Sequence, residues 1–142
     1  MAFNLLVVDD SAVMRRMIIR ALRLSGLPLG EVHEAADGEE GLRQLDQHWI
    51  DLVLVDLNMP VLNGEEMIRR VRERPEMADL PIVVVSTDGS ETRQERLRDS
   101  VAGFVHKPFA PETLRDTISG VLGVTGDREA GDDALSRGSG DF

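Results

Sequence analysis

Short apolar runs recur along the chain, and each ends at polar residues or at a turn. Residues 3–8, 51–55 and 81–86 are apolar almost without interruption. This pattern predicts strands that are buried on both faces within a parallel sheet. Residues 32–36 are less apolar, which favours an edge of the sheet, and residues 102–106 predict a last strand.

Between these runs, apolar residues recur at helical intervals, and helices are predicted over 11–25, 37–49, 63–75, 91–99 and 111–122. The residues expected on the buried face of the first helix are Val13, Met14, Met17, Ile18, Ala21 and Leu22. Asp37 can cap the second helix, with Glu40 completing a capping box. The fourth helix has only Leu97 as a strong apolar anchor, so we expect it to be loosely held and mostly exposed.

Strands and helices therefore alternate about five times, which predicts an α/β fold with a parallel sheet covered by helices on both faces. The doubly wound strand order 2-1-3-4-5 is the expected arrangement. We assign residues 1–124 to this one domain. The pattern stops in residues 125–142, where glycines lie among acidic and small polar residues. A flexible acidic tail is expected there.

Composition excludes several classes of function. The chain has 142 residues, no cysteine and a formal net charge of −10. A disulfide framework is therefore impossible, and attraction to nucleic acid or to an anionic membrane is disfavoured. No signal peptide or membrane-spanning run is visible, so we expect a cytoplasmic protein whose partners are other proteins.

Three carboxylates follow two strands that the predicted order makes neighbours. Asp9 and Asp10 come after the first strand, and Asp56 follows the third. Like charges brought together need a cation, and Mg²⁺ prefers oxygen ligands. We expect Asp10 and Asp56 to bind it directly and Asp9 through water, with a turn carbonyl near Asn58 as a further ligand. The alternative is that Asp9 or Asp10 only caps the first helix.

Lys107 is the only lysine among the 16 lysines and arginines of the chain, and it follows the last strand. A compact ammonium suits a narrow site for one phosphate or carboxylate oxygen better than a guanidinium does. Pro108 after it can adopt a cis bond. Ser86 ends the fourth strand, and its hydroxyl can donate to Asp56; Thr87 is the competing candidate. The three histidines show no ligand spacing and are interpreted as surface or edge residues.

A dication, a carboxylate nucleophile, a hydroxyl and an ammonium together suit phosphoryl transfer, in which catalysis is mostly positioning and charge neutralisation. Asp56 can attack a phosphoryl donor and form an acyl phosphate. Lys107 and the dication would offset charge on the transferring oxygens.

Asp9-Asp10, Asp56, Ser86 and Lys107-Pro108, in this order, resemble the receiver domain of two-component response regulators over residues 3–123. The resemblance implies the flavodoxin-like fold, which CheY also has. It implies that Asp56 takes a phosphoryl group from a phosphohistidine of a sensor kinase or phosphotransfer protein. It also implies roles for the neighbouring residues. These are Mg²⁺ binding by Asp10, Asp56 and the carbonyl of Asn58, phosphoryl contacts from Ser86 and Lys107, an aromatic switch at Phe104, and tuning of self-dephosphorylation by Asn58 and Asp88.

Such a domain is a signalling module rather than an enzyme with a separate substrate. The expected output is a protein contact through the 91–123 face, in chemotaxis or in a phosphorelay, as a monomer or as a phosphorylation-dependent dimer. One alternative is a Mg²⁺-dependent phosphohydrolase with an aspartyl nucleophile, although Asp9 and Asp10 are adjacent rather than spaced as Asp-x-Asp. A flavin-binding carrier of similar fold is a second alternative, but aromatic residues are few.

Overall fold

The computed structural model describes residues 2–123, so the predicted tail lies outside the described residues. Five strands form one parallel sheet in the order β2-β1-β3-β4-β5. They are β1 Phe3–Val8, β2 Leu29–Ala35, β3 Leu52–Val55, β4 Ile82–Ser86 and β5 Gly103–His106. The predicted fold and strand order are confirmed. The second strand starts three residues earlier than predicted, because its half-exposed edge position leaves it without a continuous apolar run.

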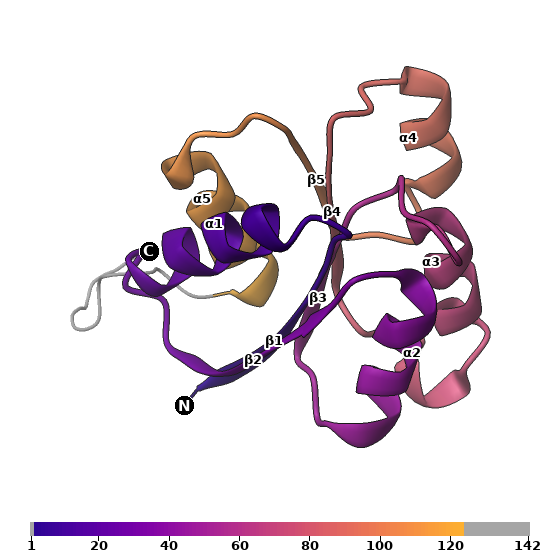
Figure 1. Cartoon of the computed structure of the whole chain (residues 1–142), viewed down its shortest axis with the longest axis horizontal. Coiled ribbons are helices and arrows are strands. Elements are labelled where there is room, and N and C mark those ends of the chain that lie inside the picture. The colour runs from indigo at the N-terminus through magenta and orange to yellow at the C-terminus, as the bar shows by residue number, and fades with distance from the viewer. Residues whose placement is uncertain (1, 124–142) are drawn as a thin grey trace.

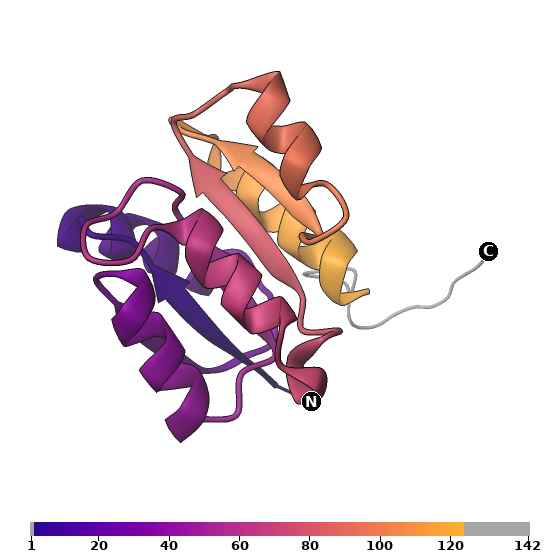
Figure 2. The same ribbon diagram turned by 90° about the vertical axis from the view of Figure 1, so that its right-hand side faces the viewer.

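Helices cover both faces of the sheet (Figure 1). On one face lie α1 Ala12–Arg23 and α5 Pro111–Leu122, and on the other lie α2 Gly38–Gln47, α3 Gly64–Arg72 and α4 Glu91–Leu97. Figure 2 looks onto this second layer, with α2, α3 and α4 side by side in front of the strands. A short 3₁₀ turn, η1 Pro75–Met77, follows α3. No helix within residues 2–123 has the length and apolarity needed to cross a bilayer.

Two apolar cores result, one on each face of the sheet. Alternate side chains of the central strands enter different cores, as the pleat of a strand requires. In β1, for example, Leu6 and Val8 face α2 and α3, whereas Leu5 and Val7 face α1 and α5. Both sets are buried. This arrangement explains why the strands were visible in the sequence as apolar runs without alternation.

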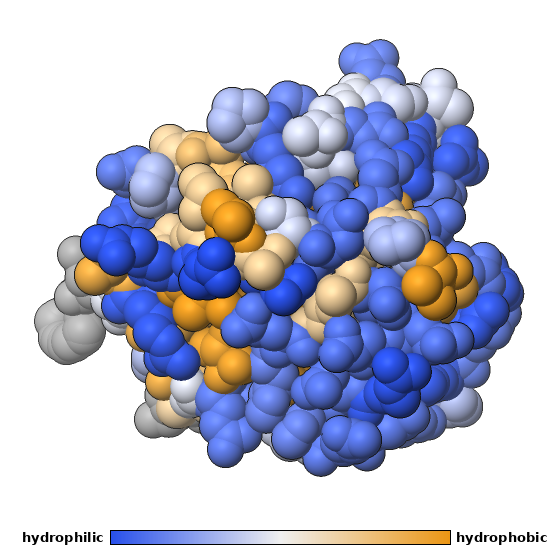
Figure 3. All heavy atoms as spheres, viewed as in Figure 1, coloured by the Kyte–Doolittle hydropathy of each residue, from blue (hydrophilic) through white to orange (hydrophobic). Residues whose placement is uncertain are grey.

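Helix α1 buries less of its apolar surface than predicted. Ile18 and Leu22 are buried in the core, but Val13 and Met17 are 58% and 53% exposed. The two exposed residues are four positions apart, so they form a second stripe on the outer side of the helix. Figure 3 shows hydrophobic side chains gathered over this part of a face that is otherwise mostly hydrophilic. Assigning all six apolar residues to one buried face was therefore wrong.

Side-chain caps fix where the helices begin at the site edge of the sheet. Asp37 accepts a hydrogen bond from the backbone N–H of Glu40 at 2.8 Å, and the Glu40 carboxylate reaches back to the N–H of Ala36 at 2.6 Å. The predicted reciprocal cap is present, shifted by one residue at its second bond. Asn63 caps α3 through the N–H of Glu66 at 2.9 Å. These caps hold the loops that precede α2 and α3.

Gly64, the first residue of α3, packs directly against the backbone of Asp56. A Cβ at this position would overlap the Asp56 carbonyl oxygen and lie 2.9 Å from its carbonyl carbon. Gly64→Ala is expected to lower the free energy of unfolding by about 1–3 kcal/mol, because the backbone must move. Urea unfolding measures the change.

Gly120→Ala is the matched control, since this exposed position in α5 has nothing within 4 Å of an added Cβ. It should raise the free energy of unfolding by about 0.5–1 kcal/mol through helix propensity. Equal effects of the two substitutions would contradict the close approach at Gly64.

Candidate functional site

The register of β1 and β3 brings three carboxylates to one edge of the sheet. Val8 pairs with Val55, and the N–H of Asp56 donates to the carbonyl of Val8 at 3.0 Å. The residues that follow these two strands therefore lie side by side at the carboxyl edge of the sheet. One carboxylate oxygen from each of Asp9, Asp10 and Asp56 lies within 4.8 Å of the other two. Asp9 and Asp56 are buried, and Asp10 is exposed.

Lys107 places its ammonium between two of these carboxylates. Its Nζ donates to Asp9 Oδ2 at 2.6 Å and to Asp56 Oδ2 at 3.2 Å. Its backbone N–H donates to the carbonyl of Ser86 at 2.9 Å, which fixes the end of β5 beside β4. The Lys107–Pro108 peptide bond is cis, as the sequence allowed. Burial alone lowers the pKa of Lys107, but the hydrogen bond to Asp9 and the charge of Asp56 raise it above its ordinary value.

The charges at this edge suit a dication. Three carboxylates carry three negative charges and Lys107 carries one positive charge, so two negative charges remain. All the donor atoms are oxygens, which Mg²⁺ prefers. Asp10 is exposed and can bind an ion that arrives from solvent. The Asp9 carboxylate already accepts hydrogen bonds from Lys107 and from the N–H of Ser11, the latter at 2.9 Å. The donor set therefore fits Mg²⁺, with Asp9 the least available for direct contact.

The first helix is capped by Ser11, not by either aspartate. The Ser11 hydroxyl accepts from the N–H of Met14 at 3.1 Å. Asp9 instead supports the turn before the helix through the Ser11 N–H. The alternative that Asp9 or Asp10 serves only as a helix cap is therefore wrong. This leaves the Asp10 carboxylate unused by the helix end.

Ser86 and Thr87 differ clearly in environment. Ser86 is 2% exposed at the end of β4, whereas Thr87 is exposed in the loop that follows. The Ser86 hydroxyl accepts a hydrogen bond from the N–H of Asp88 at 3.1 Å. The expected hydrogen bond from this hydroxyl to Asp56 is not among its contacts in the described residues. Ser86 therefore supplies the hydroxyl beside the carboxylates, but its hydrogen bond is to the β4–α4 loop. Its contact with a phosphoryl group stays a prediction.

Phe104 lies in β5 and packs, half buried, against the core under α2, α3 and α4. Core packing accounts for this position by itself, and its role as a switch stays a prediction. His106 is exposed next to Lys107 and makes no hydrogen bond or ion pair with the carboxylates within residues 2–123.

Two of the histidines lie together, although the sequence shows no ligand spacing for them. The rings of His33 and His48 stack with centroids 3.8 Å apart and planes 20° apart, and His33 Nε2 lies 3.1 Å from Glu31 Oε1. The ligand atoms of the three residues are within 4.8 Å of one another. Imidazole lone pairs lie in the ring planes, and the planes of two stacked rings are nearly parallel, so the two lone pairs do not converge on one ion. Only the two-residue alternation of Glu31 and His33 was readable from the sequence.

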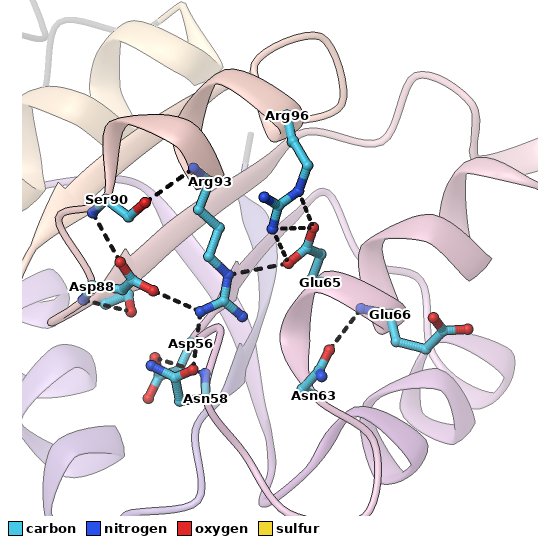
Figure 4. Close-up of polar contacts among 10 residues, drawn as sticks. Asp56, Asn58, Asn63, Glu65, Glu66, Asp88, Ser90, Arg93 and Arg96 are labelled. Atoms are coloured by element: carbon cyan, nitrogen blue, oxygen red, sulfur yellow. Dashed lines mark hydrogen bonds and ion pairs between the residues drawn. The ribbon is translucent and has the colours of Figure 1, made fainter.

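An arginine cluster above Asp56 was missed by the sequence reasoning (Figure 4). Arg93 Nη1 donates to Asp88 Oδ2 at 2.6 Å and to Asn58 Oδ1 at 3.1 Å, and its Nε donates to Glu65 Oε1 at 3.1 Å. Arg96 also pairs with Glu65, at 3.1 Å. Helix α4 buries only Leu97, as predicted, but these ion pairs hold it more firmly than its apolar content suggested. The available signal was the three-residue spacing of the two arginines on one helix face.

The ion pairs also set the ionisation of this cluster. A hydrogen bond from the Ser90 N–H and then one from Arg93 hold the pKa of the Asp88 carboxyl below its ordinary value. Burial alone would lower the pKa of Arg93, but its bonds to Asp88 and Glu65 raise it. The pKa of Glu65 is lowered, chiefly by its hydrogen bond to Arg96. Asp88, Glu65 and Arg93 are therefore all charged at neutral pH.

Residues 5–119 match the family described as response regulator receiver domain. The chain belongs to this family. The receiver is 37% identical over 123 residues to chemotaxis protein CheY1 of Helicobacter pylori, covering 85% of this chain and 98% of that protein. It is also 37% identical to the CheY homolog of Campylobacter jejuni, covering 93% of that protein. A solved structure of chemotaxis protein CheY4 from Vibrio cholerae matches 86% of this receiver and 100% of that chain, with a TM-score of 0.77 and 34% identity.

Lys107 gives the receiver a simple alkaline stability profile. The chain has no cysteine and no tyrosine, so Lys107 is its only side chain that ordinarily titrates between neutrality and the range of arginine. Its pKa is raised in the folded state, so the unfolded chain loses this proton first as pH rises. The stabilisation from Lys107 is therefore complete below about pH 10 and is lost as pH rises through the folded pKa. Urea unfolding across this interval should show a decline for the receiver and none for Lys107→Met. The same decline in both proteins would contradict the assignment.

Proposed function

We propose that this receiver accepts a phosphoryl group on Asp56 from a phosphohistidine of a sensor kinase or phosphotransfer protein, with Mg²⁺ as cofactor. The observation that carries the proposal is the placement of the Asp56 carboxylate. It lies at the carboxyl edge of the sheet and accepts a hydrogen bond from the Lys107 ammonium, and one of its oxygens is within 4.8 Å of an oxygen of Asp9 and of one of Asp10. In open α/β sheets, ligands bind at this edge.

In the proposed step, an Asp56 oxygen forms a bond to phosphorus while the bond from phosphorus to the histidine nitrogen breaks. The electron pair of that bond returns to the imidazole, and the product is an acyl phosphate. Lys107 holds Asp56 in place and stays protonated because its pKa is raised, so its charge remains available to the transferring oxygens. The buried Ser86 hydroxyl lies at the end of the neighbouring strand β4 and supplies a further hydrogen bond to them.

Asp10, Asp56 and the backbone carbonyl of Asn58 are the proposed ligands of Mg²⁺, with Asp9 acting through water. When bound, the ion would neutralise negative charge on the phosphoryl oxygens. The proposal rests on the oxygen donors and on the two unbalanced negative charges at this edge.

The proposed output is a phosphorylation-dependent protein contact made by the 91–123 face, which carries Phe104. Helix α4 suits a two-state element because Leu97 is its only buried residue, so its position depends mainly on the ion pairs of Arg93 and Arg96, which can exchange partners. The relatives named as chemotaxis proteins favour control of motility over a phosphorelay step. We propose that the receiver acts in the cytoplasm, where its phosphohistidine donors would reach it.

Asp56→Asn tests the acceptor directly. The receiver incubated with Mg²⁺ and a small acyl phosphate should gain one labile phosphoryl group, because an ionised carboxylate attacks phosphorus and an amide does not. Intact-mass spectrometry measures the gain. Asp56→Asn should show none, whereas Asp99→Asn, an exposed control, should match the receiver. An adduct of the same stability in Asp56→Asn would refute the assignment.

Asp10→Ala tests the proposed metal ligand set. Asp10 is exposed and holds no helix end, so its removal should leave the fold intact. Mg²⁺ affinity, measured by calorimetry without any donor, should fall by at least about tenfold because one charged oxygen ligand is lost. An unchanged affinity would remove Asp10 from the set, and loss of the folded state can be checked by circular dichroism.

A further inference from the structure

One guanidinium connects three elements around the site. Arg93, near the start of α4, donates to Asn58 in the β3–α3 loop, to Asp88 in the β4–α4 loop and to Glu65 in α3 (Figure 4). Its side chain is only 18% exposed, so these contacts are substantially shielded from water. An arginine held by three oxygen acceptors has a fixed position rather than a freely solvated one.

Two of its partners flank Asp56 from opposite loops. Asn58 lies two residues after Asp56, and its N–H is 3.4 Å from Asp56 Oδ1. Asp88 lies two residues after Ser86, and its N–H donates to the Ser86 hydroxyl. In the geometry that we infer, a water molecule that attacks a phosphoryl group on Asp56 approaches from solvent between these two loops. The side-chain oxygens of Asn58 and Asp88 would then be the acceptors that its hydrogen atoms meet.

Arg93 already donates hydrogen bonds to those side-chain oxygens. Its Nη1 binds both Asn58 Oδ1 and Asp88 Oδ2, and the second Asp88 oxygen accepts from the N–H of Ser90 at 2.8 Å. A carboxylate with both oxygens engaged is less able to orient a water or to accept its proton. The lowered pKa of Asp88 acts in the same direction, because a weaker base gives less general-base catalysis.

We propose that Arg93 prolongs the phosphorylated state of Asp56 by keeping Asn58 and Asp88 from binding the hydrolytic water. This inference rests on the proposed function. In the hydrolysis that it slows, the water oxygen bonds to phosphorus and the bond from phosphorus to the Asp56 oxygen breaks. The Asp56 carboxylate is regenerated, inorganic phosphate leaves, and the proton of the water passes to a base or to solvent. Arg93 is thus a positioning residue that acts through its two partners.

Arg96 offers a matched control on the same helix. It pairs with Glu65 as Arg93 does, but within residues 2–123 it makes no hydrogen bond to Asn58 or Asp88. Arg96→Ala therefore weakens the contact between α3 and α4 and leaves both acceptors engaged. Any effect of Arg93 that depends only on holding α4 should appear in Arg96→Ala as well.

The test measures decay of the adduct in the full chain. The receiver, Arg93→Ala and Arg96→Ala are each loaded with a small acyl phosphate and Mg²⁺, desalted rapidly, and followed by intact-mass spectrometry. A positioned general base is worth about 10²–10⁴-fold, so partial release of Asp88 should accelerate decay about tenfold in Arg93→Ala. Arg96→Ala should decay at the rate of the unsubstituted receiver. Arg93→Lys keeps the charge and the fold, but a compact ammonium cannot span all three acceptors, so an intermediate rate is expected.

A double variant shows whether Arg93 acts through Asp88. If it does, Arg93→Ala combined with Asp88→Ala should lose most of the acceleration seen in Arg93→Ala alone. The proposal is overturned if Arg93→Ala decays at the rate of the receiver or more slowly, if Arg96→Ala decays as fast as Arg93→Ala, or if the acceleration persists when both Asp88→Ala and Asn58→Ala are combined with Arg93→Ala. Absence of any adduct in the unsubstituted receiver is a different result, because it rejects the proposed function itself.

Discussion

The rest of the site depends on a lysine held between two buried carboxylates. Lys107 joins Asp9 after β1 to Asp56 after β3, and it comes from the end of β5. Without this cation, two buried negative charges would face each other in a poorly solvated place, which is costly. The interaction therefore links three strand ends that are distant in sequence. It also orients the Asp56 carboxylate, which its proposed role as a nucleophile requires.

Burial explains which parts of the fold were predictable from sequence. β1, β3 and β4 are covered by helices on both faces, so they appear as apolar runs with clear ends. β2 lies at an edge and is half exposed, and its start was placed too late. The outward stripe of α1 was assigned to the core because apolar residues on two sides of a helix look, in sequence, like one wide face. Errors thus arose where apolar content and burial diverge.

The site residues also differ in whether the sequence could predict them. The carboxylates and Lys107 were predictable because each directly follows a strand, and the ends of neighbouring parallel strands must meet. Arg93 was not, because its position depends on how far a long side chain reaches between α4 and two loops. In the sequence, such an arginine cannot be distinguished from those of a solvated helix face. The stacked pair of His33 and His48 was missed for the same reason, since its members come from an edge strand and the end of a helix.

Lys107 is the only lysine of the chain, and only 8% of it is exposed. Reagents that acylate lysine side chains therefore have a single target here, and it lies inside the carboxylate cluster rather than on the surface. Acylation would remove the charge that Asp9 and Asp56 share. The rate of acylation measured at Lys107 itself, for example by mass spectrometry of the peptide that contains it, would consequently report how often the cluster opens to solvent.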